Sequence, residues 1–139
     1  MIRKGQVSTE LIAVIAFVLF LFIPALFFAY SKSGEITNEL DMRKAYVSVE
    51  RLSSLANSVG YCGQNSSIVA EIDVPGSVEK IEFRSYGDGG EVVAHLLDGG
   101  DIVKPVSFRI EGDPLTPGFY RIEISSDGER VYAKKFPSS

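Results

Sequence analysis

Residues 11–30 read LIAVIAFVLFLFIPALFFAY, twenty consecutive residues without a charged side chain. A helix rises about 1.5 Å per residue, so this segment spans roughly 30 Å, the thickness of the hydrocarbon core of a bilayer. From Lys32 onward the sequence is charge-rich, and residues 64–139 have the pattern of strands. A domain of that size is too small to surround the apolar segment on all sides. We therefore expect the segment to be inserted in a membrane at some stage.

The residues before the apolar run narrow the explanations for it. A secretory signal peptide has an apolar stretch of about 7–15 residues followed by a small-residue cleavage site. Here the run is longer, and SKSGEI follows it. A signal anchor would explain the run, with Arg3 and Lys4 holding its start in the cytoplasm. An anchor has no use for Glu10, whose carboxylate next to hydrocarbon costs on the order of a few kcal/mol unless it is paired.

The stretch that joins the basic pair to the apolar run reads KGQVSTEL. Lys4-Gly5 followed by Gln6, Ser8 and Glu10 resembles the class III signal of archaeal type IV pilins, in which Q-x-S-x-E follows the cleaved bond. The rotating relatives of these pilins, the archaellins, usually have a glycine-rich start after the cut. The sequence QVSTEL departs from that pattern and favours a non-rotating pilus.

The resemblance implies how the protein is processed and assembled. A prepilin-peptidase-type protease would cut between Gly5 and Gln6 on the cytoplasmic face, so residues 1–5 would be a leader peptide. Glu10 would become the fifth mature residue, a position at which type IV filament subunits carry a glutamate. The implied partners are identical subunits in a helical homopolymer, the protease, a pilus assembly platform and its ATPase. The precursor would lie in the cell membrane and the mature protein in an adhesive filament outside the cell.

Glu10 also has a role that follows from physical chemistry. Cleavage frees an α-amine at Gln6 with an unperturbed pKa of about 7.7–8. Inside a bundle of apolar helices, this amine and the Glu10 carboxylate both need a partner. Pairing between an incoming subunit's amine and a neighbour's Glu10 would neutralise both and fix the axial register. The alternative is an interfacial glutamate that reaches lipid headgroups or accepts hydrogen bonds from Ser8 or the backbone.

A helical pattern continues beyond the membrane segment. We expect one helix over residues 6–60, with an apolar part at 11–30 and an amphipathic part at 35–59. Pro24 removes a backbone hydrogen bond and should bend the helix or loosen a turn, and residues 31–34 form a second weak point. Gly60 is the expected helix stop. The amphipathic stripe should seat the lower half of the helix on the following domain, while the upper half suits partner helices; Val47 and Leu55 widen a stripe made of Ile36, Leu40, Ala45, Val49, Leu52, Ala56 and Val59.

Residues 64–139 change to a period of two, which is typical of strands. Turn residues such as Asp127-Gly128 separate the alternating segments. The expected fold class is α+β, with the long helix followed by a small antiparallel β-sandwich that is either immunoglobulin-like or an open barrel. The expected strands are residues 68–74, 78–86, 91–97, 106–110, 120–124 and 131–136.

The β domain offers no pattern typical of catalysis. It has no serine, histidine and carboxylate at motif spacing, no phosphate loop and no C-x-x-C, so we expect neither an enzyme nor a cofactor. The formal charge of −4 gives no basic surface for nucleic acid. The acidic turns at residues 88–91 and 98–101 have ligands that suit Ca²⁺, but we interpret them as solvated turns and expect no metal.

His95 is expected to be a partly buried strand residue with a satisfied hydrogen bond. Cys62 is expected to be a small packed residue, with an intersubunit disulfide as the alternative.

Asn65-Ser66-Ser67 is an N-x-S acceptor for N-glycosylation, which has meaning only if the domain lies outside the cell.

Together these features predict a structural subunit of a type IV pilus-like adhesion filament. Its apolar helices would pack in the filament core and its β domains would coat the outside. The alternative function is a membrane-anchored cell-surface binding protein that displays the sandwich without polymerising, and such a receptor needs neither Glu10 nor the KGQ junction.

Overall fold

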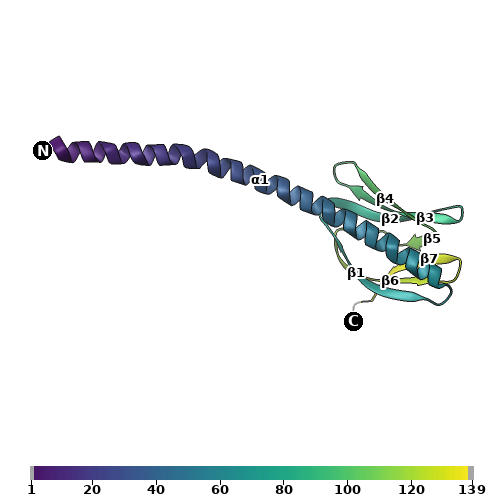
Figure 1. Ribbon diagram of the computed structural model, residues 1–139. Coiled ribbons are helices and arrows are strands. Elements are labelled where there is room, and N and C mark those ends of the chain that lie inside the picture. Colours follow the sequence, from purple (N-terminus) through teal and green to yellow (C-terminus); the bar gives the residue numbers. More distant parts are fainter. Residues whose placement is uncertain (1, 138–139) are drawn as a thin grey trace. The chain divides into compact units, whose positions relative to one another are not determined.

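The computed structural model describes residues 2–137, with the side chains of residues 5–137. Met1 and the side chains of residues 2–4, which belong to the expected leader, lie outside the described residues. The chain begins with a single helix, α1 (Ile2–Cys62), and neither Pro24 nor residues 31–34 interrupt it. The chain divides into two compact units, Met1–Asn38 and Glu39–Ser139. The first unit is helix alone, and the second combines the rest of α1 with all of the strands (Figure 1).

Seven strands follow the helix and form two separate sheets, so the fold class is α+β without a closed barrel. One sheet has the order β1-β6-β7-β5 and the other the order β2-β3-β4. All neighbouring strands are antiparallel except β5 and β7, which are parallel. The strands are β1 (Ser67–Val74), β2 (Val78–Tyr86), β3 (Gly89–Leu96), β4 (Asp101–Val106), β5 (Arg109–Gly112), β6 (Gly118–Ser126) and β7 (Arg130–Lys135).

The prediction of a single strand at residues 106–110 was wrong. Val106 is the last residue of β4 and pairs with Gly90, whereas Ile110 lies in β5 and pairs with Val131 of the other sheet. The alternating apolar residues therefore straddle a change of sheet. Pro105 had concealed β4 in the sequence because proline cannot donate to a sheet ladder. It is tolerated here because β4 is an edge strand with β3 as its neighbour.

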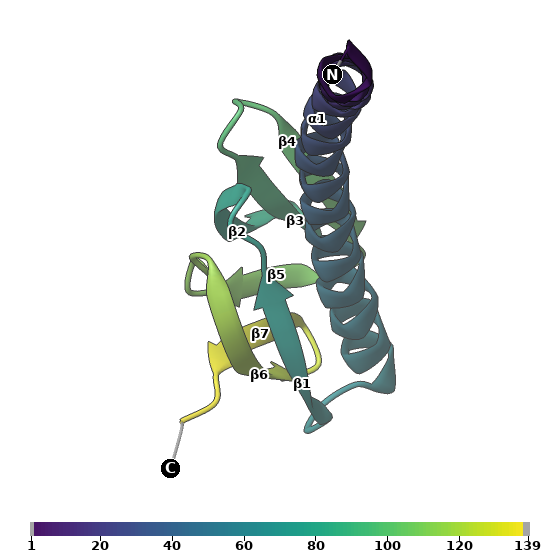
Figure 2. The same ribbon diagram turned by 90° about the vertical axis from the view of Figure 1, so that its left-hand side faces the viewer.

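The lower half of α1 contributes a complete stripe to the core of the β domain. Ala45, Val49, Leu52, Ala56 and Val59 are buried and pack with apolar residues from both sheets, as the periodicity predicts. Figure 2 shows these last turns of α1 alongside the strands. Val47, expected to widen the stripe, is instead exposed. The helix thus supplies one wall of the core.

Polar side chains of α1 also cover the edges of both sheets. Ser48 donates its hydroxyl to the carbonyl of Asp73 on β1 at 2.6 Å, and Ser53 donates to the carbonyl of Pro105 on β4 at 2.8 Å. Both serines are buried, and these bonds satisfy them. On the far side of the sandwich, the Ser85 hydroxyl of β2 donates to the carbonyl of Ile110 on β5 and accepts from its N–H.

The helix does not stop at Gly60 as expected. It continues to Cys62, and Gly63 ends it with a φ of +88°, a left-handed conformation that favours glycine. Gly60 is required for another reason. A Cβ at this position would overlap the ring of Phe108, which packs directly against the helix backbone. The glycine that looked like a helix terminator is a packing residue.

Candidate anchoring and assembly site

The first unit leaves its apolar residues uncovered. Every described residue from 5 to 40 is exposed, and the most apolar 18-residue window of the helix has no buried share at all. Among the described residues, one helix, α1, is long enough and apolar enough to cross a membrane. Moving each large apolar side chain out of water is worth about 1.5–3 kcal/mol. A segment of this kind needs lipid or protein around it.

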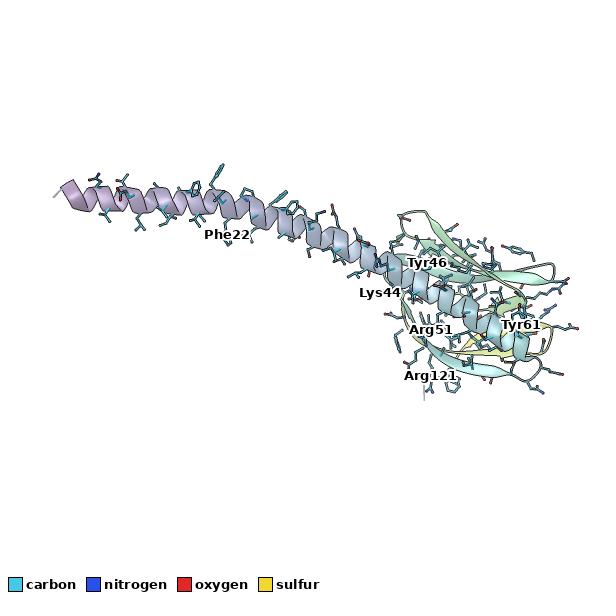
Figure 3. All side chains as sticks on the ribbon, viewed as in Figure 1. Phe22, Lys44, Tyr46, Arg51, Tyr61 and Arg121 are labelled. Carbon is cyan, nitrogen blue, oxygen red and sulfur yellow. The ribbon has the colours of Figure 1, made fainter. Side chains whose placement is uncertain are left out.

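The exposed apolar side chains surround the helix instead of forming one stripe. Phe20 and Phe22 are two positions apart, which separates them by about 200° around the helix axis, and both are well exposed. In Figure 3 side chains project from both sides of this segment, with Phe22 labelled. A single partner face would cover only one of the two sides. The surroundings that suit the segment are a bilayer or a bundle of several helices.

At the start of α1, helical geometry places only some residues of the class III motif on the same face. Gln6 and Glu10 are four positions apart and lie on one face, whereas Ser8 lies about 200° from Gln6 around the axis. Thr9 donates its hydroxyl to the carbonyl of Gly5 at 2.9 Å. Among the hydrogen bonds of the described residues, none joins Ser8 to Glu10. Glu10 is exposed. If the chain were cleaved after Gly5, Glu10 would lie beside the first turn of the remaining helix.

This position has an electrostatic consequence. Negative side chains near a helix N-terminus are stabilised by the helix dipole, typically by about 0.3–1 kcal/mol. Removal of residues 1–5 would place Glu10 near the new N-terminus and add an amine on the same face. The carboxylate of Glu10 could then pair with an amine at this end of the helix.

No match to this chain is found among protein-family models, curated proteins or solved structures. Any function proposed for this chain therefore rests on its residues and their geometry.

The glycosylation acceptor lies in an exposed turn between α1 and β1. Asn65 has a φ of +64°, and its backbone N–H donates to the carbonyl of Ser126 at 3.0 Å. Ser66 turns inward, where its hydroxyl bonds the carbonyls of Val59 and Gly63. The Asn65 side chain is accessible, which glycan transfer requires. Glycosylation at Asn65 stays a prediction.

His95 is partly buried and hydrogen-bonded, as the sequence predicts. Its Nε2 lies 2.9 Å from a carboxylate oxygen of Glu82, and its Nδ1 lies 2.8 Å from Asp101. The bond to Glu82, followed by that to Asp101, raises the pKa of His95 above its usual value. The bond from Lys80 to Glu82, followed by that from His95, lowers the pKa of Glu82 to about 2. This cluster ties β2, β3 and β4 together.

Two other expectations concern single residues and turns. Cys62 is exposed, so the expectation of a packed cysteine was wrong: the last turn of α1 directs it away from the core. In the acidic turn at residues 98–101, Asp98 accepts the N–H of Gly100 at 2.9 Å. Within the described residues, no group of three His, Cys, Asp or Glu side chains could hold a metal ion.

The sequence did not reveal a surface depression of about 410 Å³ between α1, β1 and the start of β6. We call it the α1–β1 hollow. Its members come from three segments far apart in the chain, so no local pattern marks it. The available signal is Phe119, an apolar residue out of phase with the alternating Ile122 and Ile124 of its strand. The hollow is lined by Leu40, Arg43, Lys44, Val47, Ser48, Arg51, Glu71, Ile72, Asp73 and Phe119.

Proposed function

We propose that this protein is a structural subunit of a filament of the archaeal type IV pilus kind. Its apolar helix segments pack together in the filament core, and its β domains coat the outside. The precursor sits in the cell membrane until cleavage between Gly5 and Gln6, and then enters a helical homopolymer on the cell surface. The protein works by assembly and adhesion, without catalysis.

The observation that carries this proposal is the uncovered apolar segment together with Glu10 at its start. A bilayer alone would accommodate residues 11–30. It gives no role to a carboxylate one residue outside them, where the charge is costly. A bundle of identical helices covers the same surface and shields Glu10 from lipid, and each neighbouring cleaved copy brings a further amine that can pair with it. The cost of this charge on a lipid-facing helix thus supports polymerisation over anchoring.

The test is to replace Glu10 and to measure insertion, cleavage and filament yield separately. Glu10→Ala should insert normally or slightly better, since a charge is removed from near the hydrocarbon. Cleavage after Gly5 should continue at least in part, because the cut bond lies five residues earlier. The yield of filaments sheared from cells should fall sharply. Glu10→Gln should be nearly as defective, because it keeps the size and hydrogen bonding but removes the charge.

Glu35→Gln is the matched control. Glu35 is an exposed glutamate on the same helix, paired with Lys32 at 3.1 Å, and exposed pairs of this kind contribute little. Its loss should leave filament yield near that of the wild type. Normal yield from both Glu10 variants would instead favour the alternative function, a membrane-anchored binding protein whose β domain is displayed without polymerising.

A further inference from the structure

The α1–β1 hollow combines an apolar floor with a charged rim. Leu40, Val47 and Phe119 supply exposed apolar surface, and Phe119 is 67% exposed. Lys44 and Arg51 lie on its helix side and are labelled in Figure 3 on one side of the domain. Among the described residues, neither of these two cations forms an ion pair. The surface is thus open to an apolar group that carries negative charge.

The charges of the rim are distributed unevenly, with cations on the helix side and carboxylates on the strand side. Arg43, like Lys44 and Arg51, belongs to the helix side, and it is paired with Glu39 at 3.1 Å. The strand side carries the carboxylates Glu71 and Asp73 of β1. An acidic ligand would be attracted to the helix side and repelled from the strand side. This asymmetry fixes the orientation of whatever binds.

The turn between β3 and β4 has the complementary chemistry. Leu97 is 67% exposed at its start, and Asp98 and Asp101 flank the glycines that follow, without a lysine or arginine in the turn. The turn is held rigidly: the N–H of Leu97 donates to the carbonyl of Ser77 at 3.0 Å, and the N–H of Leu96 donates to Gly100 at 2.8 Å. An ordered turn loses little conformational freedom when it binds.

We propose that the β3–β4 turn of one copy inserts into the α1–β1 hollow of a neighbouring copy. Leu97 would lie on Leu40, Val47 and Phe119, while Asp98 faces the cations of the helix side. The apolar residues of both surfaces are exposed within a single copy. The inference rests on the proposed function, since it describes how the β domains of a filament contact each other.

This contact joins two different surfaces of the same chain. Such heterologous contacts repeat from copy to copy, and they build open helical filaments when the rotation does not close a ring. A contact between two identical surfaces would end at a dimer. The β domains would therefore reinforce the polymer that the apolar helices form, and charge complementarity would fix its register.

Disulfide trapping in filaments tests the contact. In a Cys62→Ser background, Val47→Cys and Leu97→Cys are introduced together, and sheared filaments are oxidised and run on a non-reducing denaturing gel. We expect a ladder of linked oligomers that reduction collapses to monomer. The control pair, Val47→Cys with Glu129→Cys in another exposed turn, should give no ladder. Intact filaments without a ladder from the Val47 and Leu97 pair, or an equal ladder from the control pair, would overturn the inference.

A charge swap decides the case in which the cysteine chains fail to assemble. Lys44→Glu and Asp98→Lys should each lower the yield of sheared filaments by about threefold, the effect of one exposed charge pair. The two changes together should restore the yield. If the double variant is no better than the single ones while the wild type forms filaments, the inference fails and the proposed function stands. If the wild type forms no filaments at all, the proposed function itself fails.

Discussion

The two halves of α1 have opposite surroundings although they belong to one helix. In residues 5–38 every side chain is exposed, whereas in residues 39–62 a stripe of five apolar side chains is buried. The difference lies in how the apolar residues are distributed. The upper half is apolar around the whole axis, and the lower half is apolar on one face.

This comparison shows what each half requires as a partner. A one-sided stripe is satisfied by the sheets of its own domain, as Leu52 and Val49 are. An apolar surface on all sides has no such partner within the described residues, and needs lipid or several other helices. The same secondary structure is therefore covered by its own domain in one half and left uncovered in the other.

The largest effect should come from removing the upper half altogether. A chain that starts at Glu35 keeps the buried stripe and loses residues 11–30, so we expect a soluble monomer that does not form filaments. Analytical ultracentrifugation and electron microscopy would measure both properties. The control is the chain from Gln6 onward, which should require detergent. Filaments from the shortened chain would show that the apolar helix is not the polymerising element.

A matched leucine substitution in each half should separate their contributions to stability. Leu52→Ala removes a fully buried side chain and should cost about 2–5 kcal/mol in the free energy of unfolding. Leu21→Ala changes an exposed position and should alter it by less than about 0.5 kcal/mol. Urea unfolding of the full chain in detergent, followed by near-ultraviolet circular dichroism, gives both values. Equal losses would contradict the division of α1 into two halves.

The sequence predicted the features that depend on local periodicity. The apolar run, the buried stripe from Ala45 to Val59 and the Asp127-Gly128 hairpin are of this kind. It failed where distant segments meet. The strand at Pro105 and the change of sheet after Val106 depend on pairing partners that are not adjacent in the chain.

The candidate site divides in the same way. The positions of Gln6 and Glu10 on one helix face follow directly from their spacing. The α1–β1 hollow could not be predicted, because it requires a helix to pass the ends of two strands that come much later in the chain. Cleavage at Gly5, pairing of Glu10 and glycosylation of Asn65 stay predictions that experiments must test.

A pair of glycine substitutions sharpens the comparison at smaller scale. Gly60→Ala in the lower half would push a Cβ into the Phe108 ring, and overpacking of this kind costs about 1–3 kcal/mol. Gly34→Ala in the upper half meets no atom within 4 Å, and should raise stability by up to about 1 kcal/mol through helix propensity. Thermal unfolding of the two variants should shift in opposite directions. A neutral Gly60→Ala would mean that Phe108 moves aside freely.

The smallest effect should be a pH dependence that belongs to the lower unit. The raised pKa of His95 means that its charged form stabilises the fold at low pH, and this contribution is lost as the pH rises through that pKa. Glu82 acts in the opposite sense: its contribution is present above pH 4.5 and is lost as the pH falls through about 2. Both contributions are fully present between the unfolded-state pKa values of 4.5 for Glu82 and 6.5 for His95, so stability should be greatest in this range. His95→Gln should remove the decline on the alkaline side, and an unchanged profile would exclude His95 as its source.

The coverage of the sheet edges has a consequence if the protein polymerises as we propose. An uncovered edge strand is a template for pairing with another chain. Here Ser48 and Ser53 occupy carbonyls along β1 and β4, and Ser85 joins β2 to β5. In crowded domains these bonds leave fewer main-chain groups open to pairing between copies. Loosening the lower half of α1 would remove two of these covers at once, and would raise the tendency of the β domains to aggregate.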